Sequence, residues 1–164
     1  MYKQTLLAGI IGALSCVPAF GDRTIAGRAS VIDGDTIEIE GERIRLHGID
    51  APESSQVCSD RAGQPYRCGQ EAALALDTFL KASRPTRCVL LGRDHRRSVG
   101  VCFRADGKDV NRWLVEFGHA LDWPKYSGGG YSKFQKFAQA AGVGLWGGAF
   151  ELPCKIRNRN NPSC

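Results

Sequence analysis

The sequence lacks a long, unbroken apolar run. Its most apolar stretch, from Leu6 to Phe20, is interrupted by glycines, Ser15 and Pro18, whereas a stable membrane-spanning helix needs about 20 consecutive apolar residues. The absence of such a run argues against a membrane span. The same stretch follows a single positive charge at Lys3, which is typical of a signal peptide.

We expect this signal peptide to cover residues 1–21, with cleavage before Asp22 and after the small residues Ala19 and Gly21. The mature protein would then be periplasmic or secreted. Two alternatives remain: a buried N-terminal helix, and a lipoprotein modified at Cys16, although the residues before Cys16 match the lipoprotein pattern poorly.

The chain also lacks any Cys-x-x-Cys pair, and its three histidines lie at no ligand-like spacing from the cysteines. Both absences argue against a zinc site. Cleavage of the signal would leave six cysteines, and an even number in an exported chain predicts three disulfides. Many pairings are possible, but proximity in the sequence favours Cys58 with Cys68, Cys88 with Cys102, and Cys154 with Cys164.

Neither sign of charge dominates, since 22 Lys and Arg stand against 17 Asp and Glu, a net charge of +5. Cleavage of the signal would lower this charge by one, because Lys3 is the only charged residue before Asp22. A mildly basic balance is compatible with a polyanionic partner such as nucleic acid, but many soluble proteins share it.

Internal repeats and low-complexity runs are absent, so residues 22–153 are expected to form one domain, followed by a loosely ordered polar tail at 154–164 that a disulfide would pin. Alternating apolar residues with short glycine-containing turns predict strands, whose positions are within 24–49, at 86–91 and at 98–103. Apolar residues at helical spacing predict helices, at 70–82, 109–117 and 131–141, while 54–67 is predicted to be a loop. This order predicts an α+β domain built on a small curled sheet.

Acidic residues surround one arginine in the first part of the chain. The turn Asp33-Gly34-Asp35-Thr36 precedes an apolar strand that contains Arg45, and this strand leaves through Asp50-Ala51-Pro52-Glu53. If Asp35 and Arg45 lie on paired strands, the acids gather at one end of the sheet beside a guanidinium group. Carboxylate oxygens suit calcium or magnesium, and a guanidinium group suits phosphate. An ordinary turn and a structural salt bridge are the alternatives.

A second source of arginine is the charged segment 93–97, which leads into an apolar strand. It can offer another guanidinium group to the same phosphate. By itself, such a run of charges is more often a solvated loop.

Together these segments resemble the staphylococcal nuclease, or thermonuclease, family over roughly residues 29–146. The motifs that carry the resemblance are Asp-Gly-Asp-Thr at 33–36, Arg-Leu-x-Gly-Ile-Asp-Ala-Pro-Glu at 45–53, Gly-Gln-Glu-Ala at 69–72, Arg-Ser-Val at 97–99, Asp-Gly-Lys-Asp-Val-Asn at 106–111 and Gly-Leu-Trp at 144–146. The resemblance implies a five-stranded OB-type β-barrel with three helices. It also implies cleavage of DNA and RNA to leave 3′-phosphate ends.

The resemblance further implies the roles of individual residues. Asp35 and Asp50, with the backbone carbonyl of Ala51, would hold calcium, and Asp33 would be a nearby acid. Glu53 would act as the general base toward water. The phosphate and its transition state would be bound by Arg45 and Arg97.

Two features depart from the family pattern. The family usually spaces its second arginine as Asp-x-Tyr-Gly-Arg, whereas the segment from Asp94 to Arg97 is one residue shorter and lacks the tyrosine. Arg97 matches better because Ser-Val follows it, and Arg96 is the alternative. Since the expected aromatic is missing, Tyr126 is predicted to contact the substrate, while Trp123 is more often the kind of residue that packs in a core.

The sequence therefore predicts an exported, monomeric, calcium-dependent nuclease. The alternatives are a catalytically inactive OB-fold module that binds nucleic acid and an OB domain that binds oligosaccharide. A binding module has no need to keep three acids and two arginines together, so the enzyme is favoured.

Overall fold

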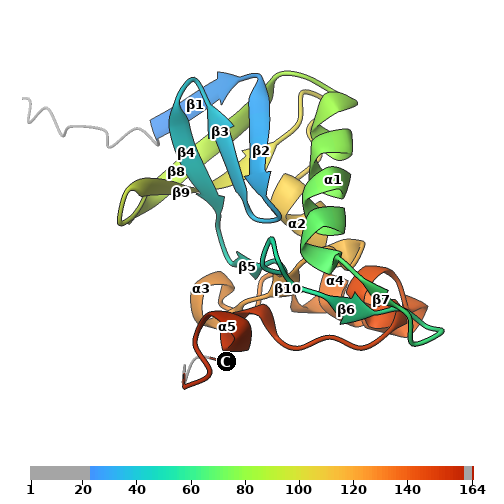
Figure 1. Cartoon of the computed structure of the whole chain (residues 1–164). Coiled ribbons are helices and arrows are strands. Elements are labelled where there is room, and N and C mark those ends of the chain that lie inside the picture. The colour runs from blue at the N-terminus through green and yellow to red at the C-terminus, as the bar shows by residue number, and fades with distance from the viewer. Residues whose placement is uncertain (1–22, 161–163) are drawn as a thin grey trace, which may run out of the picture.

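The computed structural model describes residues 23–160 and Cys164, so the predicted signal peptide and Cys16 lie outside the described residues. Its main sheet has six strands in the order β1-β8-β9-β4-β3-β2 (Figure 1). These strands are β1 (Arg23–Gly27), β2 (Ala29–Asp33), β3 (Thr36–Ile39), β4 (Glu42–Leu46), β8 (Thr86–Asp94) and β9 (Arg97–Phe103). All neighbours are antiparallel except β4 and β9, which run parallel.

The sheet curls strongly. Only Arg28 separates β1 from β2, yet these two strands lie at opposite ends of the strand order. The sheet must therefore bend round until its two edges approach each other, and a Cβ on Gly27 would lie only 2.9 Å from the Ile39 side chain on β3. This geometry confirms the predicted α+β class and OB-type barrel. The expected five strands are six because the first is divided at Arg28.

Two short ribbons extend the fold beyond the barrel. The first joins β5 (Ile49–Asp50) to β10 (Leu121–Asp122). The second joins β6 (Cys58–Ser59) to β7 (Pro65–Tyr66), within the segment that the sequence predicts to be a loop.

Three helices correspond to those expected from the sequence: α1 (Cys68–Lys81), α2 (Val110–Glu116) and α4 (Ser132–Ala141). Asp109 caps α2 by accepting a hydrogen bond from the Arg112 N–H at 2.9 Å, and Gly142 ends α4 with a positive φ of 59°. Three shorter helices are additional: α3 (Pro124–Ser127), the 3-10 helix η1 (Gly144–Gly147) and α5 (Pro153–Arg157).

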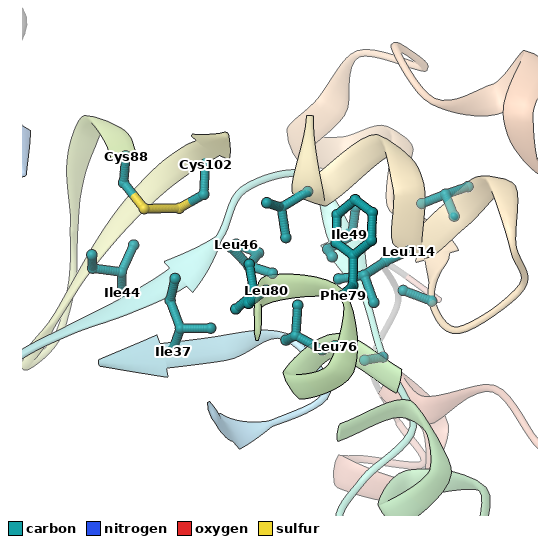
Figure 2. Close-up of a cluster of buried hydrophobic side chains, with 14 of the residues drawn as sticks. Ile37, Ile44, Leu46, Ile49, Leu76, Phe79, Leu80, Cys88, Cys102 and Leu114 are labelled. Carbon is teal, nitrogen blue, oxygen red and sulfur yellow. A yellow bond between two sulfur atoms is a disulfide. The ribbon is translucent and has the colours of Figure 1, made fainter. Parts of the chain in front are cut away.

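The core lies between the barrel and α1, as Figure 2 shows. The sheet contributes buried branched side chains, and α1 contributes an apolar face that packs against them. The labelled members include Ile37, Ile44 and Leu46 from strands and Leu76, Phe79 and Leu80 from α1. Burying a side chain of this kind stabilises the fold by about 1.5–3 kcal/mol, so this contact fixes the helix against the barrel.

Three disulfides have the pairing that the sequence favours. Cys88–Cys102 joins opposite residues of β8 and β9 inside the core. Cys58–Cys68 ties β6 to the start of α1, and Cys154–Cys164 ties α5 to the C-terminal residue. Among the described residues, no helix is both long and apolar enough to cross a membrane.

Candidate active site

The site begins with an ion pair across two strands of the barrel. Thr36 on β3 lies opposite Arg45 on β4, which brings the neighbouring Asp35 beside the arginine. The Arg45 guanidinium group reaches both carboxylate oxygens of Asp35, at 3.2 and 2.9 Å. The predicted meeting of Asp35 and Arg45 on paired strands is therefore observed, and the pair has the planar two-point geometry that favours charge recognition.

Asp50 also approaches the same guanidinium group, at the nitrogen that pairs with Asp35. It belongs to β5, where it pairs with Leu121 of β10, and one of its carboxylate oxygens is 3.9 Å from Arg45. The next residue, Ala51, donates its N–H to Asp35 at 3.5 Å. A Cβ on Gly34 would lie 2.8 Å from the Ala51 Cβ. The acidic turn and the exit of the second strand are thus packed directly together.

Glu53 is positioned mainly through its backbone. Its N–H donates to the Gln56 side chain at 3.1 Å, and its carbonyl accepts from the Gln56 N–H at 2.7 Å. A Cβ on Gly69, in the first turn of α1, would lie 1.8 Å from the Glu53 carbonyl oxygen. The start of α1 therefore approaches the Glu53 backbone more closely than any residue with a side chain would allow.

Arg97, rather than Arg96, reaches this region. Arg96 is exposed on the turn between β8 and β9, whereas Arg97 is the first residue of β9 and donates to Asp94 at 3.0 Å. A small cavity of about 130 Å³ brings together the predicted site residues other than Asp50 and Tyr126. Its lining comprises Asp33, Asp35, Arg45, Ala51, Pro52, Glu53, Ser54, Arg97 and Arg157.

Two aromatic residues line a second cavity, a groove of about 490 Å³ that shares Arg45, Arg97 and Arg157 with the first. Tyr126 is 50% exposed there and meets Trp123 edge to face, with 4.8 Å between ring centroids. Trp123 thus lines the groove and lies outside the main core, and the Arg45 guanidinium carbon is 5.8 Å from its ring centroid. Both aromatics are placed where a nucleotide base could contact them.

The charges of the site are unbalanced around Asp35. Burial raises the pKa of this carboxyl to about 6, against the opposing effect of Arg45, and the charges of Asp33 and Asp50 raise the pKa further. One arginine therefore does not offset the combined effect of burial and two neighbouring acids on Asp35. Within residues 23–160 and Cys164, no three carboxylate, imidazole or thiol groups are arranged so as to hold a metal ion. The donor set of Asp35, Asp50 and the Ala51 carbonyl nevertheless fits a hard divalent cation completed by water.

Comparison with known proteins agrees with this geometry. Residues 43–148 match the family model described as staphylococcal nuclease homologue. The chain belongs to the staphylococcal nuclease family. A relative in Rhizobium meliloti (strain 1021), the succinoglycan biosynthesis protein ExoI, is 52% identical over 98% of this chain and 86% of its own length. Proteins named uncharacterized endonuclease in Escherichia coli and its O157:H7 strain are each 28% identical over 75% of this chain and 77% of theirs.

The span that matches the family does not contain the whole site. It includes Arg45, Asp50, Glu53 and Arg97, but Asp35 precedes it and Arg157 follows it. Sequence reasoning found Asp35 through the Asp-Gly-Asp turn. It missed Arg157, because the tail after Pro153 was expected to be loosely ordered.

The first residues of this tail belong to α5 (Pro153–Arg157), with Arg157 at the end of the helix. Pro153 opens this helix at a position where a missing N–H costs nothing, and Cys154 is buried. The Arg157 guanidinium group forms ion pairs with Asp50 and with Glu53. The signal available in the sequence was the cysteine pair that brackets this arginine, which indicates a pinned segment but not where it lies.

Proposed function

We propose that this protein is an exported, calcium-dependent endonuclease that acts as a monomer, hydrolysing phosphodiester bonds of DNA or RNA and leaving 3′-phosphate ends. One observation carries the proposal. A single cavity gathers the buried Asp35, a partly exposed glutamate and two arginines from separate strands, and the buried Asp50 lies 3.9 Å from one of these arginines. Such a set matches a negatively charged reaction centre better than it matches an uncharged ligand.

The arginines are assigned to the phosphate. Arg45 and Arg97 lie on neighbouring strands, β4 and β9, and both line the cavity. Each guanidinium group can donate two parallel hydrogen bonds to phosphate oxygens, and both remain charged throughout the reaction. They would stabilise the extra charge that develops when water attacks phosphorus.

Glu53 is assigned as the general base that accepts the proton of the attacking water. Its side chain is 32% exposed and borders the same cavity, so it can reach a water molecule there. The close packing of its backbone against Gly69 and Gln56 limits its movement. A positioned base of this kind contributes on the order of 10²–10⁴-fold in rate.

Asp35 and Asp50, with the Ala51 carbonyl, are assigned to the cation. A bound calcium ion would supply positive charge beside the phosphate and polarise its oxygen. The raised pKa of Asp35 supports this assignment, because a cation would offset the buried negative charge. Tyr126 and Trp123 in the adjoining groove are assigned to a base of the substrate, since aromatic rings stack on any base.

Export is supported by the three disulfides, because such bonds persist in oxidising compartments such as the periplasm or the extracellular space. The predicted signal peptide would direct the chain there.

The test is a cleavage assay with purified protein. Single-stranded DNA and RNA are incubated with calcium or with a chelator, and the product ends are identified by their sensitivity to a 3′-phosphatase. We expect cleavage with calcium only. Binding of both polymers without cleavage under any divalent cation would instead indicate the inactive binding module.

Asp35→Ala refines the metal assignment. Loss of a primary ligand should raise the calcium concentration needed for half-maximal cleavage. A variant with an unchanged calcium midpoint would remove Asp35 from the proposed cation site.

The name of the Rhizobium relative concerns polysaccharide biosynthesis, so the same assay includes a bacterial polysaccharide. We expect no cleavage or retention of the polysaccharide, because two arginines beside an acid pair suit a phosphodiester. Retention of the polysaccharide in place of nucleic acid would favour the oligosaccharide-binding alternative.

A further inference from the structure

The C-terminal segment covers the acid that the proposed cation needs. In Figure 1, α5 lies beside β5 and α3, near the end of the chain. Asp50 is almost completely buried there, and α5 engages both of its carboxylate oxygens. Oδ2 accepts a hydrogen bond from the Cys154 N–H at 3.1 Å, and Oδ1 pairs with the Arg157 guanidinium group.

Arg157 also engages the proposed base. The second terminal nitrogen of its guanidinium group pairs with Glu53 Oε1, so one planar group bridges Asp50 and Glu53. The guanidinium carbon is 5.4 Å from the centroid of the Trp123 ring. The site therefore contains a second positive charge at Asp50, besides that of Arg45, and it comes from the C-terminal segment.

We propose that Arg157 is a further residue of the metal site, which competes with the divalent cation for Asp50 and so sets the calcium concentration that the protein requires. This inference rests on the proposed cation site. A cation that coordinates Asp50 needs at least one carboxylate oxygen, and it repels a guanidinium group at the same atom. Arg157 must leave Asp50 when calcium binds.

The same movement frees Glu53. Because one guanidinium group holds both acids, its displacement from Asp50 removes the two-point bridge and leaves Glu53 Oε1 open to water. Calcium binding at Asp50 and the availability of Glu53 as a base are thereby linked, because both require Arg157 to leave. Arg157 acts through these two acids and is a positioning residue.

Calcium binding, measured by isothermal titration calorimetry with calcium chloride, tests this inference without relying on cleavage. The full-length mature protein is compared with Arg157→Gln, Arg157→Lys and Arg159→Gln. Arg159 is exposed in the same segment, so its replacement makes the same change in net charge away from the bridge.

We expect Arg157→Gln to bind calcium about three- to tenfold more tightly than the wild type, the range for displacing one or two partly exposed ion pairs. Arg157→Lys should fall between the two, because an ammonium group keeps the charge but cannot form the planar bridge. Arg159→Gln should match the wild type. The calcium midpoint of cleavage should shift in the same direction as the binding constant.

Unchanged or weaker calcium binding by Arg157→Gln would overturn the competition, and so would an equal gain in Arg159→Gln. A lower cleavage rate in Arg157→Gln at unchanged calcium affinity would assign Arg157 to the phosphate instead. If the wild type and all variants failed to bind calcium while DNA was still cleaved, the cation assigned under the proposed function would be wrong as well.

Discussion

Two arginines approach the same carboxylate oxygen of Asp50, Oδ1, and the structure holds them in different ways. Arg45 belongs to β4, which is hydrogen-bonded to a strand on each side, and its side chain is only 16% exposed. Arg157 ends a helix of five residues, and its side chain is 31% exposed. The barrel therefore fixes the backbone of Arg45, while its guanidinium group contacts Asp35 and Asp50.

Arg157 is held largely by the acids that it touches. Its guanidinium group contacts Asp50, Glu53 and the ring of Trp123. An arginine whose backbone lies in a sheet can keep its position while charges in the site change. An arginine on a short terminal helix, held by its own ion pairs, can move away when a divalent cation binds its acidic partner. We call the part of the site that carries Arg45 the barrel wall and the part that carries Arg157 the C-terminal wall. The proposed catalysis is assigned to the barrel wall, and the proposed exchange with calcium to the C-terminal wall.

The largest effect is expected at Glu53, which lines the small cavity together with Arg45 and pairs with Arg157. Glu53→Gln keeps the size of the side chain but removes the proton acceptor, so the cleavage rate at saturating calcium should fall about 10²-fold or more. Initial rates on single-stranded DNA measure this loss. Glu116→Gln is the matched control, because Glu116 lies on α2 in an ion pair with Arg112. A rate close to that of the wild type in Glu53→Gln would refute the role of base.

Arg45→Lys tests the role of the barrel wall directly. Lysine keeps the charge but loses the planar fork that reaches Asp35 and would reach phosphate, so we expect the rate to fall about 10- to 100-fold. Steady-state cleavage at saturating calcium measures it. The exposed Arg43, on the same strand and paired with Glu38, provides the control Arg43→Lys. Equal losses in both variants would mean that general charge on β4, and not the site, drives activity.

Gly69→Ala perturbs the support of Glu53 without altering any charge. The new Cβ would lie 1.8 Å from the Glu53 carbonyl oxygen, so α1 must shift. Overpacking of this kind typically lowers the free energy of unfolding by about 1–3 kcal/mol. Urea denaturation measures this loss. Gly92→Ala is the control, because a Cβ there meets nothing within 4 Å. Equal stability of the two variants would show that the close approach does not constrain Glu53.

The parts of the fold that the sequence predicts are those governed by local rules. Alternating apolar residues gave the strands, helical spacing gave α1, α2 and α4, and Asp109 and Gly142 marked helix ends where the structure has them. The division of the first strand at Arg28 was missed, because it depends on two different pairing partners, β8 and β3. Such partners come from closure of the sheet and leave no local pattern.

The candidate site likewise contains contacts that local sequence rules could predict and contacts that they could not. The meeting of Asp35 and Arg45 follows from strand pairing over a short turn, so the sequence could predict it. Arg157 could not be placed, because it pairs with Glu53 across 104 positions of sequence and with Asp50 across 107, and no periodicity encodes either ion pair. Trp123 was expected in the core, but it lines the groove beside both arginines. A single aromatic residue in a loop carries no signal that separates these places.

The smallest effect is expected at Tyr126, in the groove that Arg45 and Arg157 both line. Tyr126 lines this groove, and half of its surface is open to a substrate. Stacking on a base contributes about 1–3 kcal/mol in known cases, and because this ring is so exposed we expect the low end, a rise in KM of about three- to tenfold for Tyr126→Ala.

Cleavage rates over a range of single-stranded DNA concentrations separate this effect from those above. Tyr126→Ala should raise KM more than it lowers kcat, because a base distant from the reacting phosphorus is held alike in the ground state and the transition state. Tyr126→Phe keeps the ring and should show a smaller rise in KM. If Tyr126→Phe raised KM as much as Tyr126→Ala, the hydroxyl group rather than the ring would contact the substrate. If neither variant changed KM, the substrate would not occupy the groove that Arg45 and Arg157 share, and the comparison of the two walls would apply to the small cavity alone.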